Sequence, residues 1–204
     1  IGDTYPYLKK VVYTFHMPIF LILSGYLSNI NKNIQSFIIS WWWLFVPYSI
    51  MELGYVIAAS VLPVREQVGD LNIINILRRV FIDPVGPYWY LHTLLICRCI
   101  HYFVDHFVCE RLDKLARLIV IGIIFGGVSE GVGIMSFPYS MYFLIGVAIR
   151  IYRLNYLSLF SPSFWSIIPL IILCCYPDNL LQFNIAGCLI VYLITSFFLW
   201  IYTY

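Results

Sequence analysis

A histidine stands near the start of a long apolar run, and a serine lies about two helical turns deeper. The run covers residues 15–27 and contains His16, Ser24 and Gly25. Because histidine titrates near neutral pH, His16 is suited to proton transfer, but an ordinary histidine at the rim of a helix bundle explains it equally well. The two side chains are about 12 Å apart along a helix, which excludes a Ser-His pair made by these two alone. Close helix packing is the favoured role of Ser24-Gly25 over a catalytic serine.

An arginine ends the aromatic-rich segment of residues 86–98, which begins Gly86-Pro87-Tyr88-Trp89. Pro87 suits the first turn of a helix, where its missing N–H costs nothing. Arg98 then lies roughly 14 Å into that helix. If the helix spans a bilayer, an arginine there costs about 2.5–3.5 kcal/mol unless it faces a partner or a wet cavity. Two roles stay open: a structural anchor, or a cation that holds an anionic group such as a phosphate or a thioester carrier.

Other polar groups accompany Arg98. His101 and Asp105 follow it at i+3 and i+7, which places all three on one helix face. Glu52 lies in another apolar segment, where a carboxylate needs a cation or a hydrogen-bond donor. One hypothesis is that Arg98 and Glu52 form an ion pair.

The composition defines the elements that must position these residues. The chain has 204 residues, of which 62% are hydrophobic and 11% charged, and its mean hydropathy is +0.87. Soluble domains have about 25% charged residues, so this is a polytopic membrane protein. A spanning helix needs roughly 20 mostly apolar residues. We predict an all-α transmembrane helical bundle in one domain over residues 1–204, with about seven spans: 12–30, 37–61, 88–108, 118–135, 137–152, 164–176 and 181–202.

Several classes of protein are excluded. The pattern has no period-2 alternation, which argues against a membrane β-barrel. The net charge of +2 is spread out and gives no sign of nucleic-acid binding. The six cysteines lie in or beside apolar segments, do not resemble a disulfide scaffold and lack metal-site spacing, so no metal is expected.

Basic residues predict the orientation. The connections near residues 31–36, 109–117 and 150–163 carry Lys or Arg, which marks the cytoplasmic side and puts His16 near the outer face. The connection near residues 62–87 also carries arginines and complicates this assignment. Its residues 71–81 predict an amphipathic helix at the membrane interface.

Together these segments resemble acyltransferase family 3, the polytopic enzymes that O-acylate cell-surface sugars, and within it the fucose 4-O-acetylase type. The similarity rests on the signature helix with Phe15-His16-Met17-Pro18-Ile19-Phe20 and Ser24-Gly25-Tyr26-Leu27. It continues in Phe45-Val46-Pro47-Tyr48, in Gly86-Pro87-Tyr88-Trp89-Tyr90-Leu91 through Arg98, and in Phe137-Pro138-Tyr139-Ser140-Met141-Tyr142-Phe143-Leu144-Ile145-Gly146.

The resemblance implies a fold of about ten spans, with a first helix bearing a catalytic Arg and His that would precede Ile1. We therefore expect a fragment, incomplete at both ends. The implied reaction transfers an acyl group, usually acetyl from acetyl-CoA as co-substrate, to a hydroxyl of a cell-surface polysaccharide or its precursor. The alternative is a transporter or flippase subunit for polysaccharide export.

The expected partners are the lipid bilayer, the sugar or polysaccharide acceptor and acyl-CoA, and the expected location is the bacterial cytoplasmic membrane. We predict His16 as a catalytic residue that orients the acceptor or relays its proton. The predicted substrate-binding residues are Arg98, Trp89, Ser24 and Glu52.

Overall fold

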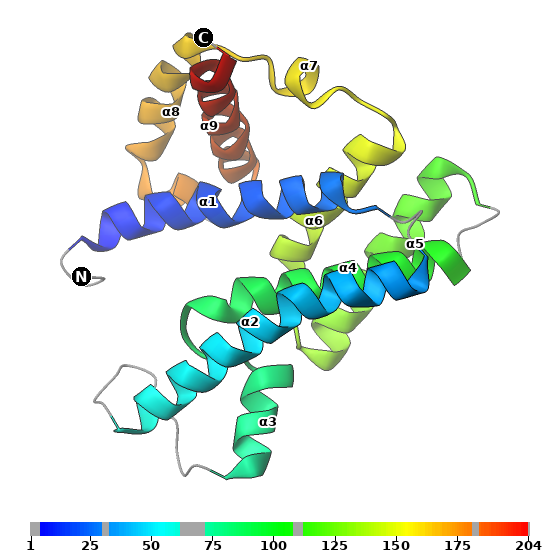
Figure 1. The fold of residues 1–204 in the computed structure, drawn as a ribbon. Coiled ribbons are helices and arrows are strands. Elements are labelled where there is room, and N and C mark those ends of the chain that lie inside the picture. Colours follow the sequence, from blue (N-terminus) through cyan, green and yellow to red (C-terminus); the bar gives the residue numbers. More distant parts are fainter. Residues whose placement is uncertain (1–4, 30–32, 62–71, 108–111, 181–183, 204) are drawn as a thin grey trace. The chain divides into compact units, whose positions relative to one another are not determined.

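The computed structural model describes residues 5–29, 33–61, 72–107, 112–180 and 184–203. Within these ranges the regular structure is entirely helical, which confirms the all-α prediction (Figure 1). Predictions that rested on Ile1, Lys32, Arg65, Cys109 and Arg111 fall outside the described residues.

The helices occur in this order: α1 Pro6–Leu27, α2 Ile34–Val61, α3 Ile73–Phe81, α4 Trp89–Phe107, α5 Lys114–Gly127, α6 Phe137–Ile151, α7 Tyr156–Phe160, α8 Ile167–Cys174 and α9 Ile185–Thr203. Short 3-10 turns lie at Gly86–Tyr88, Phe164–Ser166 and Pro177–Leu180, and a π-helical turn at Val128–Val132 extends α5.

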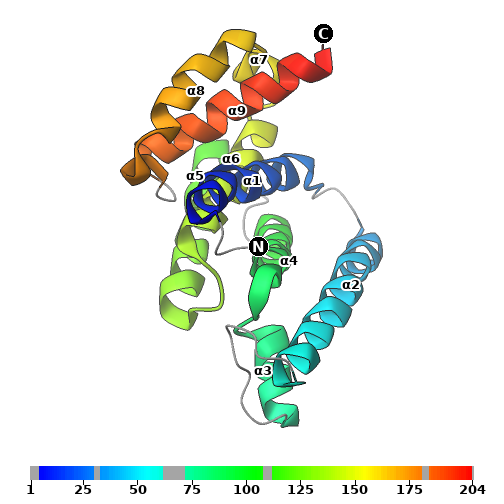
Figure 2. The same cartoon turned by 90° about the vertical axis from the view of Figure 1, so that its left-hand side faces the viewer.

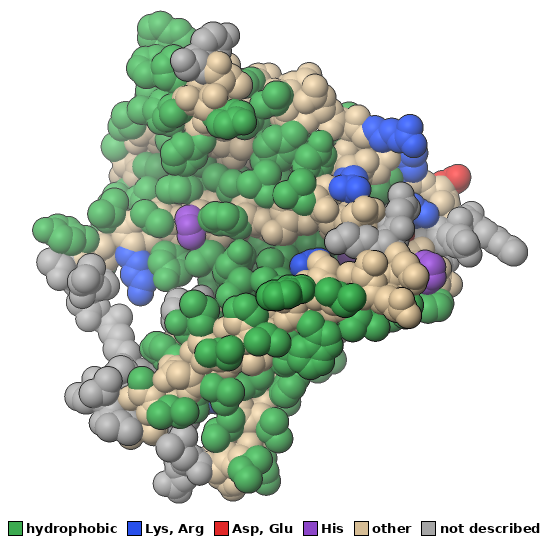
Figure 3. All heavy atoms as spheres, viewed as in Figure 1, with side chains coloured by type: hydrophobic (Ala, Val, Ile, Leu, Met, Phe, Trp, Pro, Cys, Tyr) green, Lys and Arg blue, Asp and Glu red, His purple; other side chains and the backbone are tan. Residues whose placement is uncertain are grey.

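The membrane-spanning character predicted from sequence is found in the structure. In the described part of the chain, four helical segments are long and apolar enough to cross a bilayer: Pro6–Leu27, Ile34–Ser60, Lys114–Val132 and Ile185–Thr203. Each of the seven predicted spans coincides with a helix. However, α4 is more polar than those four, and α6 and α8 are shorter than a full span. On the face shown in Figure 3, hydrophobic side chains are far more widespread than charged ones.

Two compact units divide the chain. Unit 1 comprises Ile1–Leu27 and Met141–Tyr204, and unit 2 comprises Ser28–Ser140. Whether they function as one domain stays a prediction. In unit 1, α9 packs against α1, α7 and α8, and Figures 1 and 2 show α8 beside α9. Polar side chains on α9 bond within the unit, and the Ser196 hydroxyl donates to the carbonyl of Ser161 at 2.6 Å.

In unit 2, α2 packs against α3 and α4, and α4 also packs against α5. The predicted amphipathic helix over residues 71–81 is observed as α3 over its described residues. Val80 is buried against α2 and α4, and Ile73, Ile74, Leu77 and Phe81 lie on the same apolar side of α3 but remain exposed. This apolar side agrees with the amphipathic pattern, and its placement at the membrane interface stays a prediction.

Candidate functional site

The signature helix of the sequence, α1, meets α6 within unit 1 at a pair of glycines. A Cβ added to Gly25 would collide with the backbone carbonyl of Phe143, and one added to Gly146 would collide with the carbonyl of Ile22. The two backbones therefore touch directly, as small residues allow in membrane proteins. This contact supports a packing role for the Ser24-Gly25 pair.

A guanidinium reinforces the same crossing. Arg150 near the end of α6 donates from Nη1 to the carbonyl of Tyr26 at 2.8 Å. Tyr26 lies in the last turn of α1, where backbone carbonyls lack helical partners and a positive charge is favoured.

The signature histidine lies on the exposed side of α1, between buried Thr14 and Met17. The His16 ring makes an edge contact with Phe20, with 5.0 Å between ring centroids. Ser24 is half-buried two turns further along the same continuous helix, so the structure keeps the two side chains apart as their spacing predicted.

Arg98 is half-buried near the middle of α4 and bonds to α2 in unit 2. Its Nη2 donates to the Ser40 hydroxyl at 2.9 Å. Ser40 precedes Glu52 by twelve residues, about 18 Å along the helix. The hypothesis of an Arg98–Glu52 ion pair was therefore wrong, because the arginine bonds to α2 at a position about 18 Å along the helix from the carboxylate.

Glu52 instead positions the start of α4. Its side chain is fully buried, and its Oε1 accepts the backbone N–H of Val85 at 2.6 Å. The next residue, Gly86, has a φ of +72°, and a Cβ there would lie 2.7 Å from the Tyr55 ring. Only glycine combines this left-handed conformation with so close an approach. Glu52 and Gly86 together fix the turn that leads into α4.

Trp89 is the first residue of α4 and is half-buried. Its ring packs on that of Tyr139 in the first turn of α6, with 4.4 Å between centroids. The substrate-binding role predicted for Trp89, like those of Ser24, Arg98 and Glu52, stays a prediction.

Two further polar contacts in unit 2 were missed by sequence reasoning. The His101 Nδ1 lies 3.0 Å from the Ser28 hydroxyl, and Asp105 pairs with Arg117 of α5 at 2.9 Å. The shared face of Arg98, His101 and Asp105 was a usable signal. The partners, however, come from three other segments, which periodicity on α4 does not reveal.

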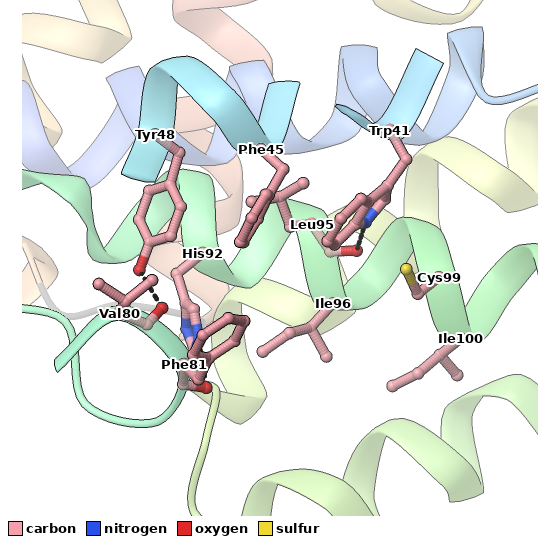
Figure 4. Close-up of a pocket in the computed structure, with 10 residues that line it drawn as sticks. All are labelled: Trp41, Phe45, Tyr48, Val80, Phe81, His92, Leu95, Ile96, Cys99 and Ile100. Atoms are coloured by element: carbon pink, nitrogen blue, oxygen red, sulfur yellow. Dashed lines mark hydrogen bonds between the residues drawn. The ribbon is translucent and has the colours of Figure 1, made fainter. Parts of the chain in front are cut away.

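A pocket of about 170 Å³ opens between α2, α3 and α4, as Figure 4 shows. Its wall is mostly aromatic and aliphatic and consists of Trp41, Phe45, Tyr48, Val80, Phe81, His92, Leu95, Ile96, Cys99 and Ile100. For metals, the described residues contain no cluster of three or more His, Cys, Asp or Glu side chains.

The helical membrane architecture, together with the signature helix and the half-buried Arg98, defines a class of integral membrane proteins with polar groups inside an apolar bundle. Comparison with known families matches residues 2–204 to the family described as "Acyltransferase domain". The chain belongs to this family, acyltransferase family 3, and is a membrane acyltransferase. No curated protein and no solved structure matched the chain.

Proposed function

We propose that this chain belongs to an O-acyltransferase that moves an acyl group, acetyl in the simplest case, from acyl-CoA to a sugar hydroxyl of a cell-surface polysaccharide or its precursor. The observation that carries the proposal is the family match over residues 2–204. The fucose 4-O-acetylase-like subgroup and a bacterial cytoplasmic membrane location are part of the same proposal.

The reaction sets chemical demands that the described residues can meet in part. A base must take the proton of the attacking hydroxyl, and a donor must stabilise the oxyanion that forms on the thioester carbonyl. Arg98 suits an anionic group of the donor, because guanidinium carries five N–H donors and the contact with Ser40 uses one of them. Its position beside α2 is fixed by that contact.

In this proposal His16 is a supporting acid–base group that orients the acceptor hydroxyl or relays its proton. It is exposed on α1, unlike the buried His92 and His101 of unit 2. An exposed imidazole can reach an acceptor hydroxyl and orient it or relay its proton. Ser24 and Gly25 then contribute to the wall and the packing beside it.

The test is an acetylation assay with labelled acetyl-CoA on membranes that contain the full-length protein. We expect strong loss of acetyl transfer in His16→Ala and in Arg98→Ala. Matched controls are His106→Ala, an exposed histidine near the end of α4, and Arg79→Ala, whose side chain pairs with Asp83 at the surface. Unchanged transfer in both site variants would refute the site assignment.

A transporter or flippase subunit is the second candidate. The supporting observation is that α1 and α2 each contain an internal proline, Pro18 and Pro47, together with a charged residue within α4. Proline-containing helices and charged groups at membrane depth are common in transporters. If the wild-type protein shows no acetyl transfer but moves a lipid-linked saccharide across vesicle membranes, this candidate replaces the first.

A further inference from the structure

In the pocket of unit 2, the polar side chains of the wall are already hydrogen-bonded to backbone carbonyls, unlike those of a typical sugar-binding site. The Tyr48 hydroxyl donates to the carbonyl of Val80 at 2.8 Å, and His92 Nε2 donates to the carbonyl of Phe81 at 2.9 Å. The indole N–H of Trp41 points to the carbonyl of Leu95 at 3.4 Å, and Figure 4 shows these contacts around the pocket. Each of these three polar side chains is engaged with backbone. A hydroxyl-rich ligand would therefore lose its hydrogen bonds to water with little in return.

The wall between these contacts suits a hydrocarbon. Trp41 and Phe45 stack with 4.7 Å between centroids, and Phe45 also stacks on Phe81 of α3 at 5.7 Å. Ile96 and Ile100 complete the side formed by α4. The pocket holds about 170 Å³. Since one water takes about 30 Å³ in the liquid, the pocket has room for a handful of methylene-sized groups.

The surroundings of the pocket point to the bilayer as the source of that hydrocarbon. Trp42 and Trp43, next to Trp41 on α2, are 50% and 78% exposed, and Phe103, one turn beyond Ile100 on α4, is 43% exposed. The helix that carries the tryptophans is long and apolar enough to cross a membrane. In a bilayer these exposed aromatic side chains face lipid, so the pocket is flanked by lipid chains.

We propose that this pocket, between α2, α3 and α4, binds the end of an acyl chain of a bilayer phospholipid. The acyl chain of the lipid inserts between Trp41 and Phe45 on one side and Ile96 and Ile100 on the other. It contacts α3 through Phe81. This inference does not depend on the acyl-transfer reaction.

The test uses the full-length protein in phosphatidylcholine vesicles that contain a phosphatidylcholine with a diazirine in one acyl chain. After irradiation, cross-linked residues are mapped by mass spectrometry. We expect labels on Ile96, Cys99 and Ile100, normalised to Ile123 of α5, which is 68% exposed and reports on general lipid contact. Absence of label from the three pocket residues in the wild-type protein would overturn the proposal.

Two variants with opposite effects separate the pocket from general lipid contact. Filling the pocket with Ile96→Trp should lower the labelling of Cys99 and Ile100 severalfold. Enlarging the pocket with Ile96→Ala should raise the labelling of the same two residues. Ile119→Trp, on an exposed site of α5, should change neither. Equal labelling in both Ile96 variants would refute the proposal, as would displacement of the probe by long-chain acyl-CoA but not by unlabelled phosphatidylcholine.

Discussion

Gly25 of α1 and Gly146 of α6 meet at a helix crossing in unit 1 where neither position has room for a Cβ atom. An alanine at either position would place its methyl group against a backbone carbonyl of the other helix. Backbone atoms cannot move aside as a flexible side chain can, so the crossing is fixed by the absence of side chains at these two positions.

Gly146→Ala should therefore destabilise the protein although alanine favours helices. Overpacking costs roughly 1–3 kcal/mol, which thermal unfolding in detergent will show as a lower midpoint. Gly54→Ala is the matched control, because a Cβ there meets nothing within 4 Å. That change should be neutral or stabilising by about 0.5–1 kcal/mol. Equal midpoints for the two variants would contradict the crossing.

Replacing Glu52 with glutamine should reduce the stability of the protein less than replacing it with alanine. Glu52→Gln keeps a carbonyl oxygen that can accept the N–H of Val85, whereas Glu52→Ala leaves that N–H without its partner. A buried polar group left unsatisfied costs about 1–3 kcal/mol. We expect the unfolding midpoint to fall in Glu52→Ala and to stay near wild type in Glu52→Gln. An equal loss in both variants would show that the negative charge is what matters.

Exchanging the charges of Arg98 and Glu52 should not restore folding. In the structure Arg98 bonds to Ser40, while Glu52 bonds to the turn before α4. The double variant Arg98→Glu with Glu52→Arg would bury each charge away from a suitable partner, at a cost that exceeds that of either single change. Yield of folded protein by size-exclusion chromatography measures this, and recovery in the double variant would reinstate the ion pair.

The ion pair between Asp105 and Arg117 should contribute far more than the exposed pair between Arg79 and Asp83. The Asp105 side chain is 5% exposed, against 56% for Asp83. Arg117→Ala leaves a buried carboxylate without its cation, which costs about 3–5 kcal/mol. Arg79→Ala should cost about 0–1 kcal/mol. Chemical denaturation of both variants tests this, and Asp105→Asn added to Arg117→Ala should recover part of the loss.

From the sequence, the positions of the helices could be predicted better than the contacts between their side chains. Apolar length located a helix within each predicted span, and the pattern of residues 71–81 predicted the amphipathic α3. Helix spacing also showed that His16 and Ser24 cannot pair. The partner of Arg98 could not be predicted, because Ser40 and Glu52 both lie on α2 and only the register of α2 against α4 decides between them. Sequence periodicity defines a face of one helix, but it carries no information on that register.

The contact of Gly25 with α6 also provides a fixed reference point on α1. His16 lies nine residues from Gly25 on the same continuous helix, about 14 Å at 1.5 Å per residue. A thinner or thicker bilayer can tilt a spanning helix, but it cannot lengthen this distance. The histidine is thus held at a fixed distance along α1 from the contact with α6, whatever the thickness of the surrounding membrane.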